Sequence, residues 1–175
     1  WTRSARSCVP VSLIPSIDDA SVAVALGANQ PSAFGSPRQT LVAVRPLLEE
    51  LLRAWAGQDL CCRWSQLWET KPVGPVQQPD YLNAVVLVQG LALVPAEPLA
   101  LELLQRLHGL ERRFGRERSQ EQRWGPRSLD LDLLFWGELR LDHPDLMLPH
   151  PRMHLRSFVL EPLLQAMQGT HPPCW

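Results

Sequence analysis

The ten residues 123–132, Arg-Trp-Gly-Pro-Arg-Ser-Leu-Asp-Leu-Asp, carry most of the information in this chain. A basic, aromatic turn runs directly into two acids, Asp130 and Asp132, and the apolar run 133–136 follows them. In a β-strand, residues i and i+2 point to the same face. The two carboxylates are therefore expected to lie side by side, with the neighbouring leucines on the opposite face.

Two parallel carboxylates repel each other, and a folded protein tolerates such a pair when a divalent cation bridges it. Oxygen ligands suit Mg²⁺, which proteins often hold with one or two carboxylates together with substrate phosphates. The alternative is that Asp130 and Asp132 form only a solvated face at the edge of a strand. The residues around Asp130 and Asp132 distinguish between these two interpretations.

The segment before the acids is rich in arginine. Residues 112–127 hold six arginines and two acids, whereas the whole chain has a formal net charge of only -1. Charges of both signs usually mix on a protein surface, and arginine binds phosphate through paired N–H donors. This local excess favours a phosphate site beside a Mg²⁺ site. The arginines nearest the acids are Arg116, Arg118, Arg123 and Arg127.

A second cluster is the proline-rich segment 69–84. Three prolines and a glycine lie within residues 72–79, which excludes a helix or a central strand and predicts an ordered loop. The loop leads into an apolar run in which Asn83 is polar, and a buried Asn needs hydrogen-bond partners. Asn83 either caps a turn or offers a donor and an acceptor to a flat heterocycle, with Tyr81 available to stack.

The third cluster spans residues 148–163. Pro151 fits the first turn of a short helix, and His150 and His154 lie four residues apart. This spacing is compatible with zinc, but the chain has neither an HExxH motif nor cysteines at ligand spacing. Zinc is therefore not favoured.

Length and composition limit the possibilities. A chain of 175 residues fits one domain, and 45% hydrophobic residues is typical of a globular protein. No apolar run reaches the roughly 18 residues of a membrane helix. The four cysteines form no CxxC pair, which favours a reduced, cytoplasmic protein. We expect a loose extension at 1–20, one domain at 21–167 and a short tail at 168–175.

Hydrophobic periodicity predicts the order of the elements. Pro46 lies inside the first expected helix and predicts either a kink or a late helix start. The order βαββαβ is that of the ferredoxin-like α+β sandwich, an antiparallel sheet with helices packed on it. The expected strands are 22–26, 61–68, 82–89 and 129–136, and the expected helices are 37–56, 98–114 and 156–167.

Taken together, the three clusters resemble the 6-hydroxymethyl-7,8-dihydropterin pyrophosphokinase family of folate biosynthesis. The resemblance covers about residues 21–167, in the family's order and spacing, and its motifs RWGPRSLDLDLL and GPVQQPDYLN are highly specific. It implies the ferredoxin-like fold and the transfer of pyrophosphate from ATP to the hydroxymethyl oxygen of the dihydropterin, with release of AMP. The similar segments are ALGAN (25–29), WETKPVGPVQQPDYLNA (68–84), LERRFGRERSQEQRWGPRSLDLDLL (110–134) and LPHPRMHLRSFVLEPL (148–163).

The resemblance implies roles on the ATP side. Asp130 and Asp132 match the acids that hold two Mg²⁺ on the ATP phosphates, in a reaction that depends mostly on positioning and charge stabilisation. The matched phosphate-binding arginines are Arg116, Arg118, Arg123 and Arg127, of which Arg123 and Arg127 are expected to be catalytic with the two acids. The matched nucleotide-side positions are His108, Glu111, His150 and Arg156.

The resemblance also implies a pterin slot. Tyr81 and Phe158 match the aromatic pair that sandwiches the pterin, and Asn83 matches the side chain that reads its amide edge. The backbone of Thr70 and Val73 is implied to do likewise. Trp124 belongs to a polar lid, residues 115–125, which is expected to be mobile without ligand and to order when its arginines meet phosphates.

The chain departs from the family pattern at three places. His108 stands where Gln occurs in some members, Ala28 stands where Ser is common, and the lid is one residue longer than in some members. The implied partners are ATP and the dihydropterin, with no nucleic acid and no membrane. A monomer is expected, with dihydropteroate synthase as a functional neighbour.

Two other classes are compatible with parts of the pattern. A ferredoxin-like module could bind RNA through the arginines and stack bases on Trp124 and Tyr81, but its aromatics do not alternate along one strand and no RNP motif is present. A non-catalytic homologue could serve as a scaffold, but the intact acid pair and arginines disfavour this. Tight RNA binding without ATP turnover would indicate the first class, and pterin binding without turnover the second.

Overall fold

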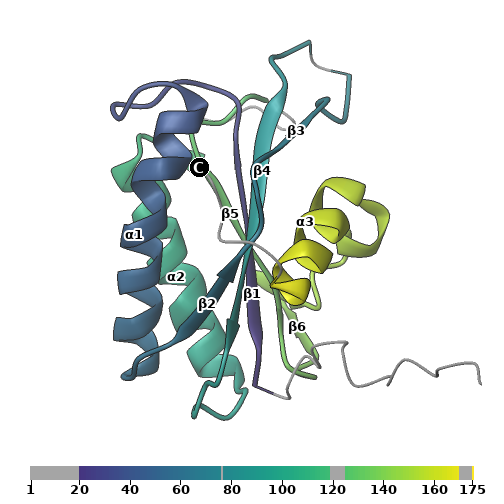
Figure 1. Cartoon of the computed structure of the whole chain (residues 1–175). Coiled ribbons are helices and arrows are strands. Elements are labelled where there is room, and N and C mark those ends of the chain that lie inside the picture. Colours follow the sequence, from purple (N-terminus) through teal and green to yellow (C-terminus); the bar gives the residue numbers. More distant parts are fainter. Residues whose placement is uncertain (1–19, 76, 119–124, 170–174) are drawn as a thin grey trace, which may run out of the picture.

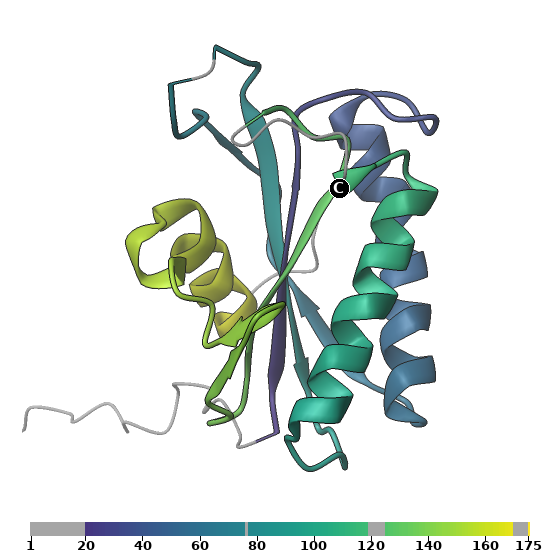
Figure 2. The same cartoon turned by 180° about the vertical axis from the view of Figure 1, so that it is seen from behind.

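The structure, a computed structural model, describes residues 20–75, 77–118, 125–169 and 175. An antiparallel sheet lies between two helices on one face and a single shorter helix on the other (Figures 1 and 2). This is the expected α+β sandwich. Except for Ala20, the extension expected at 1–20 lies outside the described residues.

The sheet has the strand order β2-β4-β1-β5, with β3 also paired to β4, and all of these pairs are antiparallel. The three long strands confirm the predicted ones to within two residues at each end. They are β1 (Val22–Ala28), β4 (Tyr81–Gln89) and β5 (Asp130–Trp136).

The three predicted helices are confirmed as α1 (Pro37–Ala56), α2 (Glu97–Arg113) and α3 (Ser157–Gln168). Helix α1 begins at a capping box, in which the side chain of Ser36 accepts from the N–H of Gln39 and the side chain of Gln39 accepts from the N–H of Ser36. The late start that Pro46 suggested is therefore wrong, because Pro46 lies inside a helix that already begins at Pro37.

The pleat of the strands separates the sheet into two faces. One face packs against α1 and α2 through residues such as Val24, Leu131 and Leu133. The other face carries Val85 and Leu87, which pack against Val159, Leu163 and Ala166 of α3. Because residues alternate between faces, the burial of Leu131 and Leu133 on the side of α1 and α2 turns Asp130 and Asp132 toward the side of α3. The two acids therefore share one face opposite the leucines, as the sequence predicts.

The single strand expected at 61–68 is wrong. The structure has two strands, β2 (Cys61–Trp64) and β3 (Trp68–Thr70), which both pair with β4. Trp64 lies opposite Val86, but Trp68 lies opposite Asn83, so the register moves by one residue. One extra residue in one strand is a β-bulge, which bends the strand and redirects the residues that follow it.

A small hairpin and a short helix connect β5 to α3, and the sequence analysis did not predict them. The hairpin consists of β6 (Leu141–His143) and β7 (Leu146–Leu148), and the 3₁₀ helix η2 spans Met153–Leu155. In a strand of three residues, the alternation of apolar and polar residues is too short to be recognised in the sequence. Among the described helices, none is both long enough and apolar enough to cross a membrane.

The bulge generates a first testable prediction. Ser65 is fully buried, and its hydroxyl accepts from the backbone N–H of Val85 at 2.9 Å. Ser65→Ala leaves that buried N–H without its acceptor, which costs about 1–3 kcal/mol. We expect the free energy of unfolding in urea to fall by this amount with an unchanged m value. A loss below about 0.5 kcal/mol, which is within the range of ordinary surface substitutions, would contradict this account.

Candidate active site

Three strands contribute residues to one row across the sheet. Gly27 in β1 lies opposite Asn83 in β4 and, on its other side, opposite Asp130 in β5. In the same way, Ala25 lies opposite Asp132. Since neighbouring strands are about 4.8 Å apart, Asn83 and Asp130 stand about 10 Å from each other across a floor of small residues.

Gly27 keeps this floor open. A Cβ atom at position 27 would lie 3.1 Å from Oδ1 of Asn83 and 3.7 Å from Cδ1 of Tyr81. The first distance is tighter than an ordinary van der Waals contact. Any larger residue at this position would push against the amide of Asn83 and narrow the space between β4 and β5.

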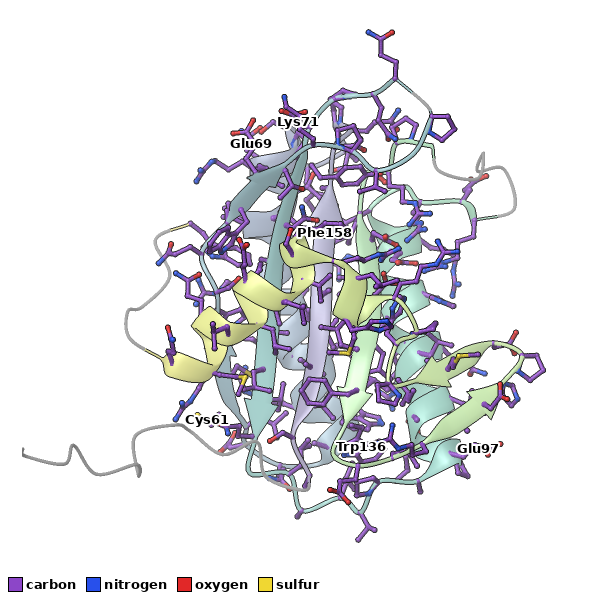
Figure 3. All side chains as sticks on the ribbon, turned by 90° about the vertical axis from the view of Figure 1, so that its right-hand side faces the viewer. Cys61, Glu69, Lys71, Glu97, Trp136 and Phe158 are labelled. Atoms are coloured by element: carbon purple, nitrogen blue, oxygen red, sulfur yellow. The ribbon has the colours of Figure 1, made fainter. Side chains whose placement is uncertain are left out.

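A cavity of about 460 Å³ lies above this row, on the side of the sheet that carries α3. In Figure 3, Phe158 lies at the end of α3 nearer to the loop that carries Lys71. Nine of the predicted site residues line the cavity: Thr70, Val73, Tyr81, Asn83, Arg127, Asp130, Asp132, Arg156 and Phe158.

At the β4 end of the cavity, the polar groups are fixed by hydrogen bonds. The Nδ2 of Asn83 donates to Oγ1 of Thr70 at 2.7 Å. The hydroxyl of Tyr81 contacts the carbonyl of Gly125 at 3.3 Å and Oε1 of Gln78 at 3.4 Å. The amide of Asn83 is therefore oriented before any ligand arrives, with its Oδ1 on the side of Gly27.

Asn29, just after β1, connects the two loops that border the cavity. Its Nδ2 donates to Oε1 of Gln78 at 2.9 Å and to the carbonyl of Pro79 at 3.0 Å. Its Oδ1 accepts from the N–H of Arg127 at 2.7 Å. Asn29 is only 2% exposed, so these bonds satisfy its buried amide and hold the proline-rich loop against the segment before β5.

The two acids of β5 have different electrostatic surroundings. Burial alone would raise the pKa of Asp130, but Arg127 and Arg116 lower it below its ordinary value. Arg127 lies 2.5 Å from Oδ2 of Asp130, and Arg116 donates to Oδ1. Burial, together with the charge of Asp130, raises the pKa of Asp132 to about 7.

A buried carboxylate in α2 anchors two of the arginines. Glu111 is 1% exposed, and its oxygens accept from the N–H of Leu131 at 2.8 Å and from Arg116 at 2.6 Å. Arg118 adds two bonds at 2.8 and 2.9 Å. Glu111 lies outside the cavity lining, so in this structure it acts on the site through Arg116 and Arg118.

His150 and Arg156 lie beside Asp132. Nε2 of His150 is 4.0 Å and Nη1 of Arg156 is 3.9 Å from Oδ2 of Asp132. Burial and the charge of Arg156 lower the pKa of His150. The guanidinium of Arg156 also lies 5.5 Å from the ring centre of Phe158, so this arginine stands between the acid pair and the aromatic wall.

The remaining predicted residues fall into two groups. Arg123 and Trp124 lie outside the described residues, as does most of the predicted lid. His108 is described but does not line the cavity, and burial with the charges of Arg118 and Arg116 lowers its pKa to about 4. Arg116, Arg118, Glu111 and His150 likewise border the site without lining the cavity.

Sequence reasoning assigned no role to several residues that build the site. Gln78, Lys71 and Arg152 line the cavity, and Asn29 holds its border. All four lie in the segments that carry the family resemblance, but their neighbours in the sequence do not reveal what they contact. Within the described part of the chain, no three His, Cys, Asp or Glu residues form a group that could hold a metal ion.

Comparison with known proteins identifies the family. Residues 23–168 match the family model described as 7,8-dihydro-6-hydroxymethylpterin-pyrophosphokinase. The 2-amino-4-hydroxy-6-hydroxymethyldihydropteridine pyrophosphokinase of Pseudomonas aeruginosa is 37% identical over 87% of this chain and 87% of its own length. The protein of the same name from Synechocystis sp. is 40% identical over 70% of this chain and 60% of its own length.

A plant relative is larger. The mitochondrial folate synthesis bifunctional protein of Arabidopsis thaliana is 37% identical over 83% of this chain, but the match covers only 23% of that protein. The matched region therefore occurs both as a chain of similar length and as one part of a longer protein. This chain belongs to the 7,8-dihydro-6-hydroxymethylpterin-pyrophosphokinase family, the ATP-dependent enzymes that transfer pyrophosphate to 6-hydroxymethyl-7,8-dihydropterin in folate biosynthesis.

Proposed function

We propose that the cavity binds the dihydropterin between Tyr81 and Phe158, with the amide of Asn83 reading the edge of the ring. The observation that carries this proposal is the orientation of Asn83, which is fixed by Thr70 above the bare floor at Gly27. A pterin presents a donor and an acceptor side by side on its amide edge, which an Asn amide complements. The backbone of Thr70 and Val73 would meet the same edge.

We further propose that Asp130 and Asp132 hold two Mg²⁺ ions together with the ATP phosphates. The donor set fits this ion, because it consists of two carboxylates on one face, beside cationic side chains that can bind phosphate. Burial and, after it, the negative charge of Asp130 raise the pKa of Asp132, and a bound cation would stabilise the ionised form of this carboxyl group. Bound Mg²⁺ would neutralise the triphosphate and stabilise the charge that develops during transfer.

The cationic residues around the acids would bind and orient the triphosphate. Arg127 and Arg156 line the cavity, whereas Arg116 and Arg118 approach from the end of α2, held by Glu111. His150, beside Asp132, and His108, beside Arg118, complete the proposed ATP side. Arg123 and Trp124 are proposed to close over both substrates, which rests on the family resemblance alone.

In the proposed reaction, the hydroxymethyl oxygen of the dihydropterin forms a bond to the β-phosphorus of ATP. The bond between that phosphorus and the oxygen bridging it to the α-phosphorus breaks, and AMP leaves with this oxygen. The hydroxyl proton is released to the solvent as the new bond forms. The roughly 10 Å between Asn83 and Asp130 across the sheet leaves room for the ring at one end and the phosphates at the other.

The expectations on assembly and location are also proposals. We propose a monomer, because the described residues of one chain are sufficient to form a cavity that holds nine of the predicted site residues. A functional link to another folate enzyme, for which dihydropteroate synthase is the proposed neighbour, is supported by the bifunctional plant relative. A cytoplasmic location is supported by the free thiols of Cys61 and Cys62, which suit a reducing compartment.

The acid pair can be tested by substitution. Asp130→Ala and Asp132→Ala should each lower the rate of AMP formation from ATP and 6-hydroxymethyl-7,8-dihydropterin by at least ~10²-fold, the scale lost with a main stabiliser of transition-state charge. Asp142→Ala, in the β6–β7 hairpin, provides a control that removes the same charge at an exposed position outside the cavity. Near-normal turnover in both active-site variants would exclude the proposed metal site.

The pterin slot can be tested separately. Asn83→Leu removes the donor and the acceptor but keeps a similar volume. The polar edge of the pterin would then be buried without its hydrogen-bond partners, which strongly lowers binding. We expect the affinity for the dihydropterin, measured by calorimetry, to fall far more than the affinity for an ATP analogue. Equal losses for both ligands would instead indicate a general disturbance of the sheet.

The pKa of Asp132 predicts a pH dependence of stability. The folded pKa of about 7 lies above the ordinary value of an aspartate, so between about pH 4 and pH 7 the folded protein binds more protons than the unfolded chain. The contribution of Asp132 to the free energy of unfolding therefore falls as the pH rises through this window.

Asp132→Asn removes this titration without a large change in shape. In chelator and without ATP, we expect the variant to be more stable than the wild type at pH 8, with a smaller difference at pH 5. Urea unfolding at the two pH values measures this. A variant that is less stable than the wild type at pH 8 would show that the ionised carboxylate is stabilised in the free protein.

A further inference from the structure

A single amide side chain of α3 meets the bulge between β2 and β3. Oε1 of Gln165 accepts from the backbone N–H of Gln66 at 2.8 Å and from the indole Nε1 of Trp68 at 3.1 Å. Gln66 belongs to the bulge and Trp68 is the first residue of β3. One oxygen thus joins the C-terminal half of α3 to the strand that follows the bulge.

Both elements joined by Gln165 carry walls of the proposed pterin slot. Two residues after Trp68, Thr70 accepts from Asn83 and leads into the loop that carries Val73. At the other end of α3, Phe158 and Val159 line the cavity. Pro162 lies between Phe158 and Gln165, and the chain is helical on both sides of it, so a contact at Gln165 bears on the position of Phe158 about 10 Å away along the axis.

The described residues show further contacts of α3 with the sheet. Among the described residues, Arg63 of β2 donates to the carbonyl of Met167 at 3.2 Å, and the buried side chains Val159, Leu163 and Ala166 provide apolar contact. Apolar packing is non-directional and allows small sliding movements. The two hydrogen bonds to Gln165 are directional, and they link α3 to β3 in particular.

We propose that Gln165 is a positioning residue for the pterin, which sets the distance between the wall on β3 and β4 and the wall on α3. In a variant that lacks the Oε1 of Gln165, the N–H groups of Gln66 and Trp68 can hydrogen-bond to water if α3 moves away from the bulge. Closing the slot around a pterin would then bury two donors without an acceptor, so pterin binding is weakened. The inference rests on the proposed binding of the pterin between Tyr81 and Phe158.

The test compares three variants. Gln165→Leu removes the acceptor and leaves an apolar side chain of similar size. Gln165→Glu keeps an acceptor oxygen, and Gln168→Leu makes the same change as the first variant at an exposed position of the same helix. The affinity for 6-hydroxymethyl-7,8-dihydropterin is measured by calorimetry with Mg²⁺ and a non-hydrolysable ATP analogue present. The affinity for the analogue is measured on its own.

We expect Gln165→Leu to weaken pterin binding by about tenfold, which corresponds to about 1.4 kcal/mol, and to leave the affinity for the ATP analogue within about twofold. Gln165→Glu and Gln168→Leu should stay within about twofold of the wild type for both ligands. A purely structural role would lower both affinities together or only the melting temperature. Pterin binding by Gln165→Leu that equals that of Gln168→Leu overturns the inference.

Two further variants keep the test decisive. If Gln165→Leu does not fold, Trp68→Phe removes one of the two donors and keeps the aromatic ring, and it should weaken pterin binding selectively by a smaller factor. Phe158→Ala tests the proposed slot itself. Unchanged pterin affinity in Phe158→Ala contradicts the proposed slot, whereas a loss in Phe158→Ala without a loss in the Gln165 and Trp68 variants contradicts only the role of Gln165.

Discussion

The antiparallel register of β1 with its two neighbours is the constraint on which the site depends. It places Gly27 opposite Asn83 and Asp130 at the same time, so one row across three strands holds an amide, a glycine without a side chain and a carboxylate. A shift of β5 by one residue would turn both acids into the core and bring leucines to the cavity. The full burial of Leu131 against α1 and α2 opposes that shift.

The second constraint is the burial of charge near the start of β5. An unpaired carboxylate in the interior is very costly, and a paired one is tolerated when its lone pairs are satisfied. Glu111 meets this condition with one backbone N–H and two arginines. This bears on the proposed ATP site, because the side chain of Arg118 remains 44% exposed while one of its edges is held by Glu111. An arginine that is already oriented loses less freedom when it binds a phosphate.

The sequence predicted the parts of the site that depend on local periodicity. The alternation in β5 was sufficient to place Asp130 and Asp132 on one face, and the apolar spacing of the three helices located them to within a residue or two. It could not predict the bulge at 65–67, because an extra residue in a run such as Cys61–Trp68 changes no hydrophobic pattern strongly enough to be seen. The contacts of Gln165 and Asn29 could not be predicted from the sequence either, because their partners lie about 50 to 100 residues away in the chain.

The site therefore combines two kinds of support. The residues proposed for chemistry and for reading the ring, Asp130, Asp132 and Asn83, project from paired strands, where backbone hydrogen bonds fix their spacing. The surfaces proposed to enclose the substrates are attached differently, since the proline-rich loop is held by the amide of Asn29 and helix α3 by the amide of Gln165. A change in such an amide can alter how tightly the cavity closes without moving the carboxylates. With these proposed roles, substrate affinity and catalytic chemistry are expected to be separable, because different hydrogen bonds hold the walls and the floor of the cavity.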